Sequence, residues 1–264
     1  MKDFKISVVT VTYNANQCVE KTIQSIVGQT YDNLEYLVID GGSTDGTQRI
    51  VEKYAERIAV FVSEKDQGIY DGMNKGIASA TGDYLLFMNA GDYFADEDVV
   101  KDVARFISSE ATDADAVYGD TLNELEYGTY PVRYDAALLG TKMCVSHQAI
   151  FVRTELLRSH PFNLQYRFAA DYEQLSSLFL EERSFRHIDR TIAVLEMTDG
   201  ATYQHYQESA DEHFTILKAR GIDVTSTQRS MMLRKRMVRW FKQKMPKCIS
   251  YPILRYLAKH YKVL

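Results

Sequence analysis

Several features that would place a chain in a specialised class are scarce in this sequence. Its 264 residues include only three cysteines (Cys18, Cys144 and Cys248), which lie far apart and lack the spacing of a metal-ligand set. This excludes a disulfide-rich scaffold and suits a reducing cytoplasm. No run of 18 or more apolar residues occurs, so we expect no transmembrane helix. The apolar stretch near the N-terminus is short and contains threonines, which does not match a signal peptide. We therefore expect a cytoplasmic protein.

The charge of the chain is unevenly distributed. The formal net charge is −5, with 45% hydrophobic and 25% charged residues, as in an ordinary globular protein. Residues 229–264, however, hold eleven Lys or Arg and no Asp or Glu, which leaves residues 1–228 at −16. This split predicts one large domain over 1–228 and a basic tail over 229–264 with a different partner.

The first third of the chain alternates between two hydrophobic patterns. Ile6–Tyr13 and Leu34–Asp40 are β-branched or apolar runs typical of buried strands, and 58–63 is a third. Between them, 15–28 shows apolar residues at helical spacing, and GGSTDGT at 41–47 is a turn that opens another helix. Strands that alternate with helices predict a mostly parallel sheet with helices on both faces, which is a Rossmann-like α/β fold.

Residues 63–94 carry the strongest local pattern. Ile69, Met73 and Ile77 recur every four residues and predict a short helix, which we expect Gly82 to end. The apolar run 84–88 then predicts a central strand that leads directly into Asn-Ala-Gly-Asp at 89–92. Open α/β sheets bind ligands where their parallel strands end, so Asp92 is a candidate metal ligand. The alternative is an aspartate that only caps a turn.

The turn after the first strand excludes one class of nucleotide enzyme. Asp40 ends the second strand, where a dinucleotide-binding fold places its ribose-binding acid. The first turn, however, reads YNANQ and lacks the glycines of G-x-G-x-x-G that bring the backbone close to a diphosphate. An NAD-dependent enzyme is therefore not expected.

The segments TVTYN, VIDGGSTDGT and EKDQGIYDGMNKGIASATGDYLLFMNAGD, in this order, resemble the family-2 glycosyltransferases of the GT-A fold. These enzymes are inverting, and many belong to bacterial polysaccharide biosynthesis. The similarity is strong over about residues 5–95 and looser over 140–200. It implies a donor half (1–95) and an acceptor half (96–228).

The resemblance implies that a nucleoside-diphosphate sugar, expected to be a UDP-sugar, binds where the strands end. Tyr13 is expected to stack on the base and Asp40 to bond it, with Asp66 and Lys75 near the nucleotide. The complete set expected to contact the nucleotide sugar is Thr12, Tyr13, Asn14, Asp40, Asp66, Gly68, Asn74, Lys75, Asn89, Ala90 and Gly91.

The chain departs from the family at the metal motif. Relatives usually present two acidic residues together, whereas here Asp92 stands alone. Phosphate oxygens and water supply most ligands of a Mg²⁺ or Mn²⁺ ion that bridges a diphosphate, so one carboxylate can suffice. We expect Mn²⁺ or Mg²⁺ at Asp92, bound more weakly than in relatives with two acids.

Two further motifs fall in the acceptor half. His147 and Gln148 precede the predicted strand 149–152, and the resemblance places them on the acceptor side; a purely structural histidine is the alternative. Asp171 opens a helix within AADY and matches the family's catalytic base, although an acid in a first turn is often a cap. We also expect a helix at 96–108, a strand at 116–120, a hairpin or loop at 123–134, and an acceptor-side loop at 197–203.

The expected chemistry needs one base and one cation. A cation at Asp92 would stabilise the departing diphosphate, and Asp171 would take the proton of the attacking hydroxyl. A single displacement at the anomeric carbon inverts its configuration. Two rivals stay open: a nucleotidyltransferase, although its Gly-rich basic loop is missing, and a non-catalytic nucleotide-sugar binding module, against which Asp171 argues.

The tail has the pattern of a helix at a membrane surface. On a helical wheel 229–245 separates an apolar side, with Trp240 and Phe241, from a side rich in Lys and Arg. This predicts binding to an anionic membrane on the inner face of the cell membrane, where a polyprenyl-linked or other saccharide acceptor would be met. The alternative is a helix packed on the acidic domain. Nucleic acid is not expected as a partner, because the domain carries −16.

Overall fold

The computed structural model describes residues 3–126, 128–197, 205–222, 244–246, 250–252 and 254. Four parallel strands form its first part: β1 (Ile6–Thr12), β2 (Leu34–Asp40), β3 (Val60–Ser63) and β4 (Tyr84–Phe87). β1 lies between β2 and β4, with Ile6 opposite both Leu34 and Tyr84. The parallel arrangement expected for these strands is confirmed.

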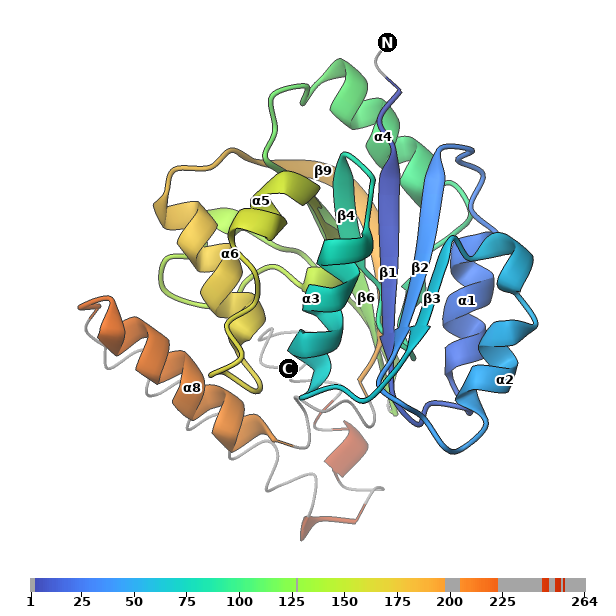
Figure 1. The fold of residues 1–264 in the computed structure, drawn as a ribbon. Coiled ribbons are helices and arrows are strands. Elements are labelled where there is room, and N and C mark those ends of the chain that lie inside the picture. Colours follow the sequence, from blue (N-terminus) through green and yellow to red (C-terminus); the bar gives the residue numbers. More distant parts are fainter. Residues whose placement is uncertain are drawn as a thin grey trace.

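The remaining strands extend the same sheet with mixed directions. They are β5 (Tyr93–Phe94), β6 (Ala116–Leu125), β7 (Gly128–Val132), β8 (Ile150–Arg153) and β9 (Phe185–Glu196). The order is β3-β2-β1-β4-β8-β6-β9-β5, with β7 paired to β6 in the hairpin expected at 123–134 (Figure 1). β8 runs antiparallel to β4 and β6, whereas β9 runs parallel to β6.

Helices cover both faces of the sheet (Figure 1). α1 (Val19–Val27) and α4 (Val99–Ser109) pack on one face, and α2 (Thr47–Glu52) lies beside α1. α3 (Ile69–Ser79), α5 (Thr154–Ser159) and α6 (Ala170–Leu180) pack on the other, and α8 (Tyr206–Ala219) lies against α6. Alternate strand residues face the two layers, so Val8 packs with the first group and Val9 with the second.

Some element boundaries differ from the sequence expectations for local reasons. Residues 15–18 form a turn, in which the N–H groups of Cys18 and Val19 both donate to Ala15 O, so α1 begins at Val19. α3 ends at Ser79, and Gly82 does not stop it. Gly82 instead lies against β1, where a Cβ would come within 2.7 Å of the Ser7 nitrogen. Of the apolar face predicted for α3, Met73 and Ile77 are buried but Ile69 is 40% exposed.

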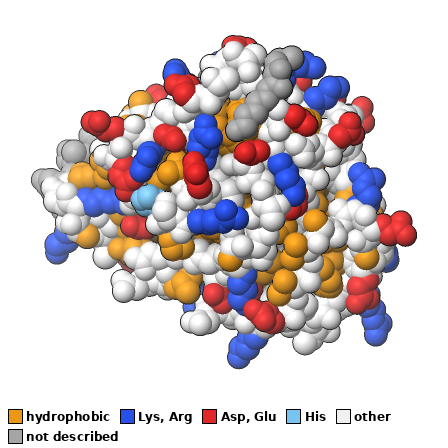
Figure 2. Space-filling view, turned by 45° about the horizontal axis from the view of Figure 1, so that its top comes forward, with side chains coloured by type: hydrophobic (Ala, Val, Ile, Leu, Met, Phe, Trp, Pro, Cys, Tyr) orange, Lys and Arg blue, Asp and Glu red, His pale blue; other side chains and the backbone are white. Residues whose placement is uncertain are grey.

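Little of the tail falls within the described residues. The predicted amphipathic helix 229–245 lies outside them except for its last two residues, and so does the expected loop 197–203 except for Met197. Ser250 and Leu254 are buried, and the Tyr251 hydroxyl donates to Glu126. Within the described ranges, no helix combines the length and apolar character needed to cross a membrane. Acidic and basic side chains are interspersed on the face that Figure 2 shows.

Candidate active site

The parallel strands β1, β2 and β4 end at one edge of the sheet, and the residues that follow them lie together there. Tyr13 directly follows β1, and its ring is 66% exposed. A Cβ placed on Gly41, after β2, would lie 3.4 Å from Tyr13 Cδ2 and 3.1 Å from Asp66 Oδ2. The exposed ring, a glycine and a carboxylate therefore meet at this edge. An aromatic face beside hydrogen-bonding groups is suited to a planar base.

Asp66 is fixed in this place by α3. Its carboxylate pairs with Lys75 at 2.5 Å, and a Cβ on Gly72 would come within 2.8 Å of Asp66 Oδ2. The bond to Asp66, reinforced by Glu64 at 2.9 Å, raises the pKa of Lys75 above its usual range. Gly68 precedes α3 with φ of +130°, a backbone conformation that glycine adopts readily. Lys75 thus stays protonated and holds Asp66 in place, with its charge paired to the carboxylates of Asp66 and Glu64.

Asp40 has structural partners on all sides. It is fully buried, and its carboxylate accepts bonds from the Ser43 N–H (3.0 Å), the Ser63 hydroxyl (2.6 Å) and Gln48 Nε2 (3.2 Å). The turn that begins at Gly41 is therefore organised around Asp40. The contact with a base that the resemblance implies would require Asp40 to release some of these donors.

Asn14 and Thr12 lie next to that turn. Asn14, with φ of +47°, accepts from the Thr44 N–H at 2.9 Å and donates its own N–H to the Ser43 hydroxyl at 2.7 Å. The Thr12 hydroxyl is buried and has no hydrogen-bond partner. These contacts join the end of β1 to the turn after β2.

The amide of Asn74, for which a nucleotide contact is expected, has protein partners at both ends. Its Nδ2 donates to Phe162 O at 3.0 Å, and its Oδ1 accepts from the Phe162 N–H at 2.9 Å. Both ends of the amide thus bond the backbone of one residue. Asn74 ties α3 to the segment that leads into α6.

The turn 89–92 follows β4 and is held by α1. The Asp92 N–H donates to Asn89 O at 3.1 Å, and Gly91 adopts φ of +106° between them. The Thr22 hydroxyl accepts from the Gly91 N–H at 3.0 Å and donates to Asp92 O at 2.7 Å. Ala90 lies within this turn and donates its N–H to Val11 O at 3.4 Å. The backbone conformation that presents the Asp92 side chain is therefore fixed.

The Asp92 carboxylate joins the two halves of the site. Its Oδ2 accepts from Gln148 Nε2 at 2.6 Å, and its Oδ1 accepts from the Glu196 N–H at 3.2 Å. Burial raises the pKa of Asp92 to about 6, although the bond from Gln148 and the nearby His147 act in the opposite direction. A nearby cation would favour the ionised form and lower this pKa.

Asp171 lies in the first turn of α6, as expected, and takes part in a chain of bonds from distant elements. Its Oδ1 accepts from the Tyr70 hydroxyl and the Tyr172 N–H, both at 2.9 Å, and its Oδ2 lies 3.2 Å from His147 Nδ1. On the other side of the ring, Asn89 Nδ2 lies 2.9 Å from His147 Nε2. Because an amide nitrogen only donates, Nε2 accepts the hydrogen bond from Asn89, and Nδ1 carries the hydrogen that it donates to Asp171 in a second hydrogen bond.

These donors keep Asp171 ionised. Burial raises its pKa, but the bonds from His147, Tyr70 and Tyr172 outweigh burial and hold the pKa below its usual range. Tyr70 lies 101 residues away in α3 and was missed in the sequence, where no local pattern links it to Asp171. A simple helix cap would not need partners from α3 and from the segment before β8.

The turn 89–92 fits a divalent cation in part. Each Asp92 oxygen accepts one protein hydrogen bond, which leaves lone pairs on both, and Asn89 Oδ1 in the same turn is buried without a partner. Such hard oxygen ligands suit Mg²⁺ or Mn²⁺. Over the described ranges, no group of three or more His, Cys, Asp or Glu is arranged to hold a metal. The chain therefore offers few ligands of its own.

Comparison with known proteins decides the family. The family model described as "Glycosyl transferase family 2" matches residues 7–159. The chain belongs to this family. A curated relative, a PGL/p-HBAD biosynthesis glycosyltransferase of Mycobacterium bovis, is 36% identical over 171 residues, which cover 63% of this chain and 66% of the relative.

Solved structures share the fold of this family-2 chain, which confirms the expected GT-A architecture. TarS of S. aureus matches with a TM-score of 0.64 and 22% identity over 90% of this chain and 43% of TarS, so the chain spans less than half of that protein. Glucosyl-3-phosphoglycerate synthase from Mycobacterium tuberculosis, solved with Mn²⁺, UDP and phosphoglyceric acid, matches with a TM-score of 0.60 and 18% identity over 84% of this chain and 80% of that one.

Proposed function

We propose that this protein transfers a sugar from a UDP-sugar to a hydroxyl of a saccharide or lipid-linked saccharide, with inversion at the anomeric carbon. Family membership supports nucleotide-sugar chemistry, and TarS of the same fold has been solved with UDP. The observation that carries the proposal is Asp171. It is a partly buried carboxylate with a lowered pKa, and His147 links it to the turn that follows β4.

Asp171 acts as the general base in this proposal. Its Oδ1 already accepts two bonds, so Oδ2 is the oxygen with capacity for the proton of the acceptor hydroxyl. As that proton moves to Oδ2, the acceptor oxygen bonds to the anomeric carbon and the bond to the diphosphate breaks. One displacement of this kind needs one base and no covalent glycosyl-enzyme.

The donor nucleotide would lie along the ends of β1, β2 and β4. The exposed Tyr13 ring would stack on the base, with Asp66, which Lys75 holds in place, beside it. Asp92 and Asn89 would hold a Mn²⁺ or Mg²⁺ ion. When bound, that ion stabilises the negative charge of the departing diphosphate.

Nucleotide binding and turnover test this proposal separately. A panel of UDP-, GDP- and dTDP-sugars is screened for thermal stabilisation with and without Mn²⁺, and positive donors are incubated with the protein to measure nucleotide release. We expect UDP-sugars to stabilise most and to release UDP slowly. Stabilisation without any release, even with acceptor mixtures, would instead favour a non-catalytic binding module.

The basic tail would bring the enzyme to its acceptor. We propose that 229–264 binds anionic membrane on the cytoplasmic side, since this segment carries eleven basic and no acidic residues. The intact chain should then sediment with anionic liposomes and be released by salt, unlike a chain ending at residue 228. Equal sedimentation of both chains would contradict this role.

A further inference from the structure

α8 lies directly against α6, the helix that carries the proposed base (Figure 1). The Tyr172 ring stacks on His213 with centroids 3.9 Å apart. Ile216 and Leu217 of α8 are buried in one apolar cluster with Ala169 and Tyr172. The two helices therefore form one packed unit.

Glu212 of α8 holds the segment that leads into α6. The residue before α6 is Ala169, whose side chain cannot accept a hydrogen bond, so no N-cap side chain fixes this end of the helix. The Glu212 carboxylate accepts instead from three successive N–H groups, those of Arg167 (2.8 Å), Phe168 (2.7 Å) and Ala169 (3.0 Å). Its negative charge also lies at the positive end of the α6 dipole.

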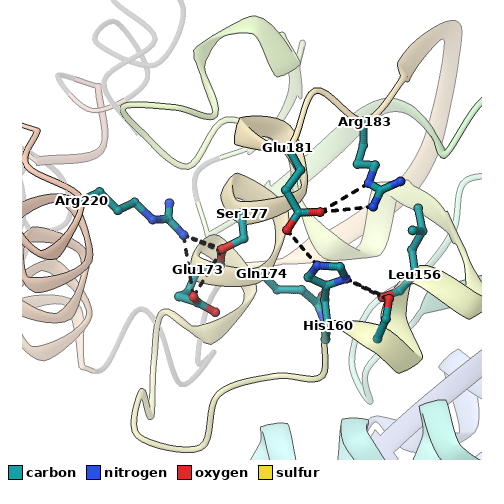
Figure 3. Close-up of polar contacts among 9 residues, drawn as sticks. Leu156, His160, Glu173, Gln174, Ser177, Glu181, Arg183 and Arg220 are labelled. Atoms are coloured by element: carbon teal, nitrogen blue, oxygen red, sulfur yellow. Dashed lines mark hydrogen bonds and ion pairs between the residues drawn. The ribbon is translucent and has the colours of Figure 1, made fainter.

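Arg220 forms hydrogen bonds to the same helix farther along. Its Nη2 donates to Glu173 O at 2.9 Å and to the Ser177 hydroxyl at 2.7 Å, as Figure 3 shows, and its Nη1 donates to the Ser176 hydroxyl at 2.5 Å. Glu212 and Arg220 thus fix α6 from one neighbouring helix at two points. The Glu212 contacts lie before the first turn of α6, whereas the Arg220 contacts lie on Glu173, Ser176 and Ser177 within the helix.

We propose that Glu212 is a positioning residue for Asp171, which fixes the start of α6 so that the carboxylate stays on Tyr70 and His147. The proposal rests on the function proposed above. Asp171 follows the last Glu212-bound residue, Ala169, by two positions, and it is held by α3 and by the segment before β8. Loss of Glu212 would free three N–H groups and let the first turn of α6 shift. A displacement of about 1 Å can cost about 100-fold in rate.

Substitutions at the two contact points test this role. We expect Glu212→Ala to lower the turnover of UDP release from UDP-N-acetylglucosamine, or from the panel member turned over fastest, by about 10-fold or more. UDP affinity measured by calorimetry should stay unchanged, because the nucleotide contacts lie on β1, β2 and α3. Glu212→Gln keeps one acceptor oxygen and should show a smaller loss. Arg220→Met is the matched control, and we expect it to lower the melting temperature without lowering turnover.

Each outcome decides between positioning and general stability. Turnover of Glu212→Ala equal to wild type, with Asp171→Asn inactive, would overturn the positioning role and leave the proposed function intact. An equal loss in Arg220→Met would show that only the packing of α8 matters. If the wild type releases nucleotide from no donor, the proposed function fails. The positioning role is then tested by the NMR resonance of the His147 Nδ1–H, which is assigned by its loss in His147→Gln. We expect that resonance to shift in Glu212→Ala and not in Arg220→Met; no shift would overturn the proposal.

Discussion

The turn after β4 and the start of α6 each present one partly buried carboxylate to the site, yet the two are held in opposite ways. Asp92 accepts from a neutral amide and a backbone N–H, and its pKa rises to about 6. Asp171 accepts from an imidazole, a phenol and a backbone N–H, and its pKa falls below the usual range. Burial is common to both, so the donors decide the direction.

This difference supports the roles proposed for the two carboxylates. A base must be ionised before substrate arrives, which Asp171 achieves with protein donors alone. A metal ligand need not be ionised beforehand, because the cation that binds it favours its ionised form. Pairs of acids whose surroundings separate their pKa values often divide the chemistry in this manner.

Asp171→Asn should have the largest effect on the comparison. The amide keeps the size of the side chain and one acceptor oxygen but cannot take a proton. We expect turnover of the best UDP-sugar to fall by about 100-fold or more, with UDP affinity unchanged in calorimetry. Turnover near the wild-type rate would reduce Asp171 to a helix cap.

Asp92→Ala tests the other carboxylate. We expect UDP binding in the presence of Mn²⁺ to weaken by about tenfold or more, about 1.4 kcal/mol or more. UDP binding without metal should change little, because Tyr13 and Asp66 remain. Calorimetry with and without Mn²⁺ separates the metal-dependent part of UDP binding from the metal-independent part. A variant that retains both its Mn²⁺ response and its turnover would place the cation elsewhere.

His147→Gln should make the surroundings of Asp171 more like those of Asp92. Without the His147 bond the pKa of Asp171 rises, so the acid limb of the turnover profile should move to higher pH. The limb appears because turnover falls once pH drops through the Asp171 pKa. At pH 7 we expect a loss of about fivefold, for one hydrogen bond of about 1 kcal/mol. An unmoved acid limb would show that His147 does not tune the base.

Glu35→Gln is a comparison outside the site. Burial raises the pKa of Glu35, but bonds from Lys5, Ser7 and Thr81 outweigh it and lower the pKa to about 2. We expect unchanged turnover and a free energy of unfolding lower by about 2 kcal/mol at pH 7. The ionised Glu35 stabilises the fold above pH 4.5 and loses this effect as pH falls toward 2. Urea unfolding of both proteins at pH 7 and pH 3 should therefore show a smaller difference at pH 3, whereas a constant difference would contradict this.

The sequence was most informative where one signal determined the structure. The buried run Leu34–Asp40 was predicted with its observed boundaries, because both of its faces are covered. Asp171 was placed correctly in the first turn of α6. β9 was missed, although its end, Thr191–Leu195, is a β-branched and apolar run that could have indicated it.

Contacts between distant segments could not be predicted in the same way. The pairing of Asn74 with Phe162 spans 88 residues, and nothing around Asn74 separates it from a ligand-binding amide. Ser43, which bonds to Asp40, lies only three residues after it, so a local turn could have been inferred there. Side-chain roles within the turn and helix motifs thus depend on partners that only the folded chain identifies.

The pairing of β5 with β9 limits how this enzyme can be redesigned. Tyr93 lies opposite Val194, and Tyr84 lies opposite Arg153, so β8, β6 and β9 of the remainder lie between β4 and β5 of the first 95 residues. A chimera that joins residues 1–95 of this chain to the rest of a relative would need matching strand registers at two separate seams. Grafting only the segment 133–149 between β7 and β8, which carries His147 and Gln148, leaves both seams intact. Such a loop graft is therefore a more practical way than exchange of halves to test which segment sets the acceptor preference.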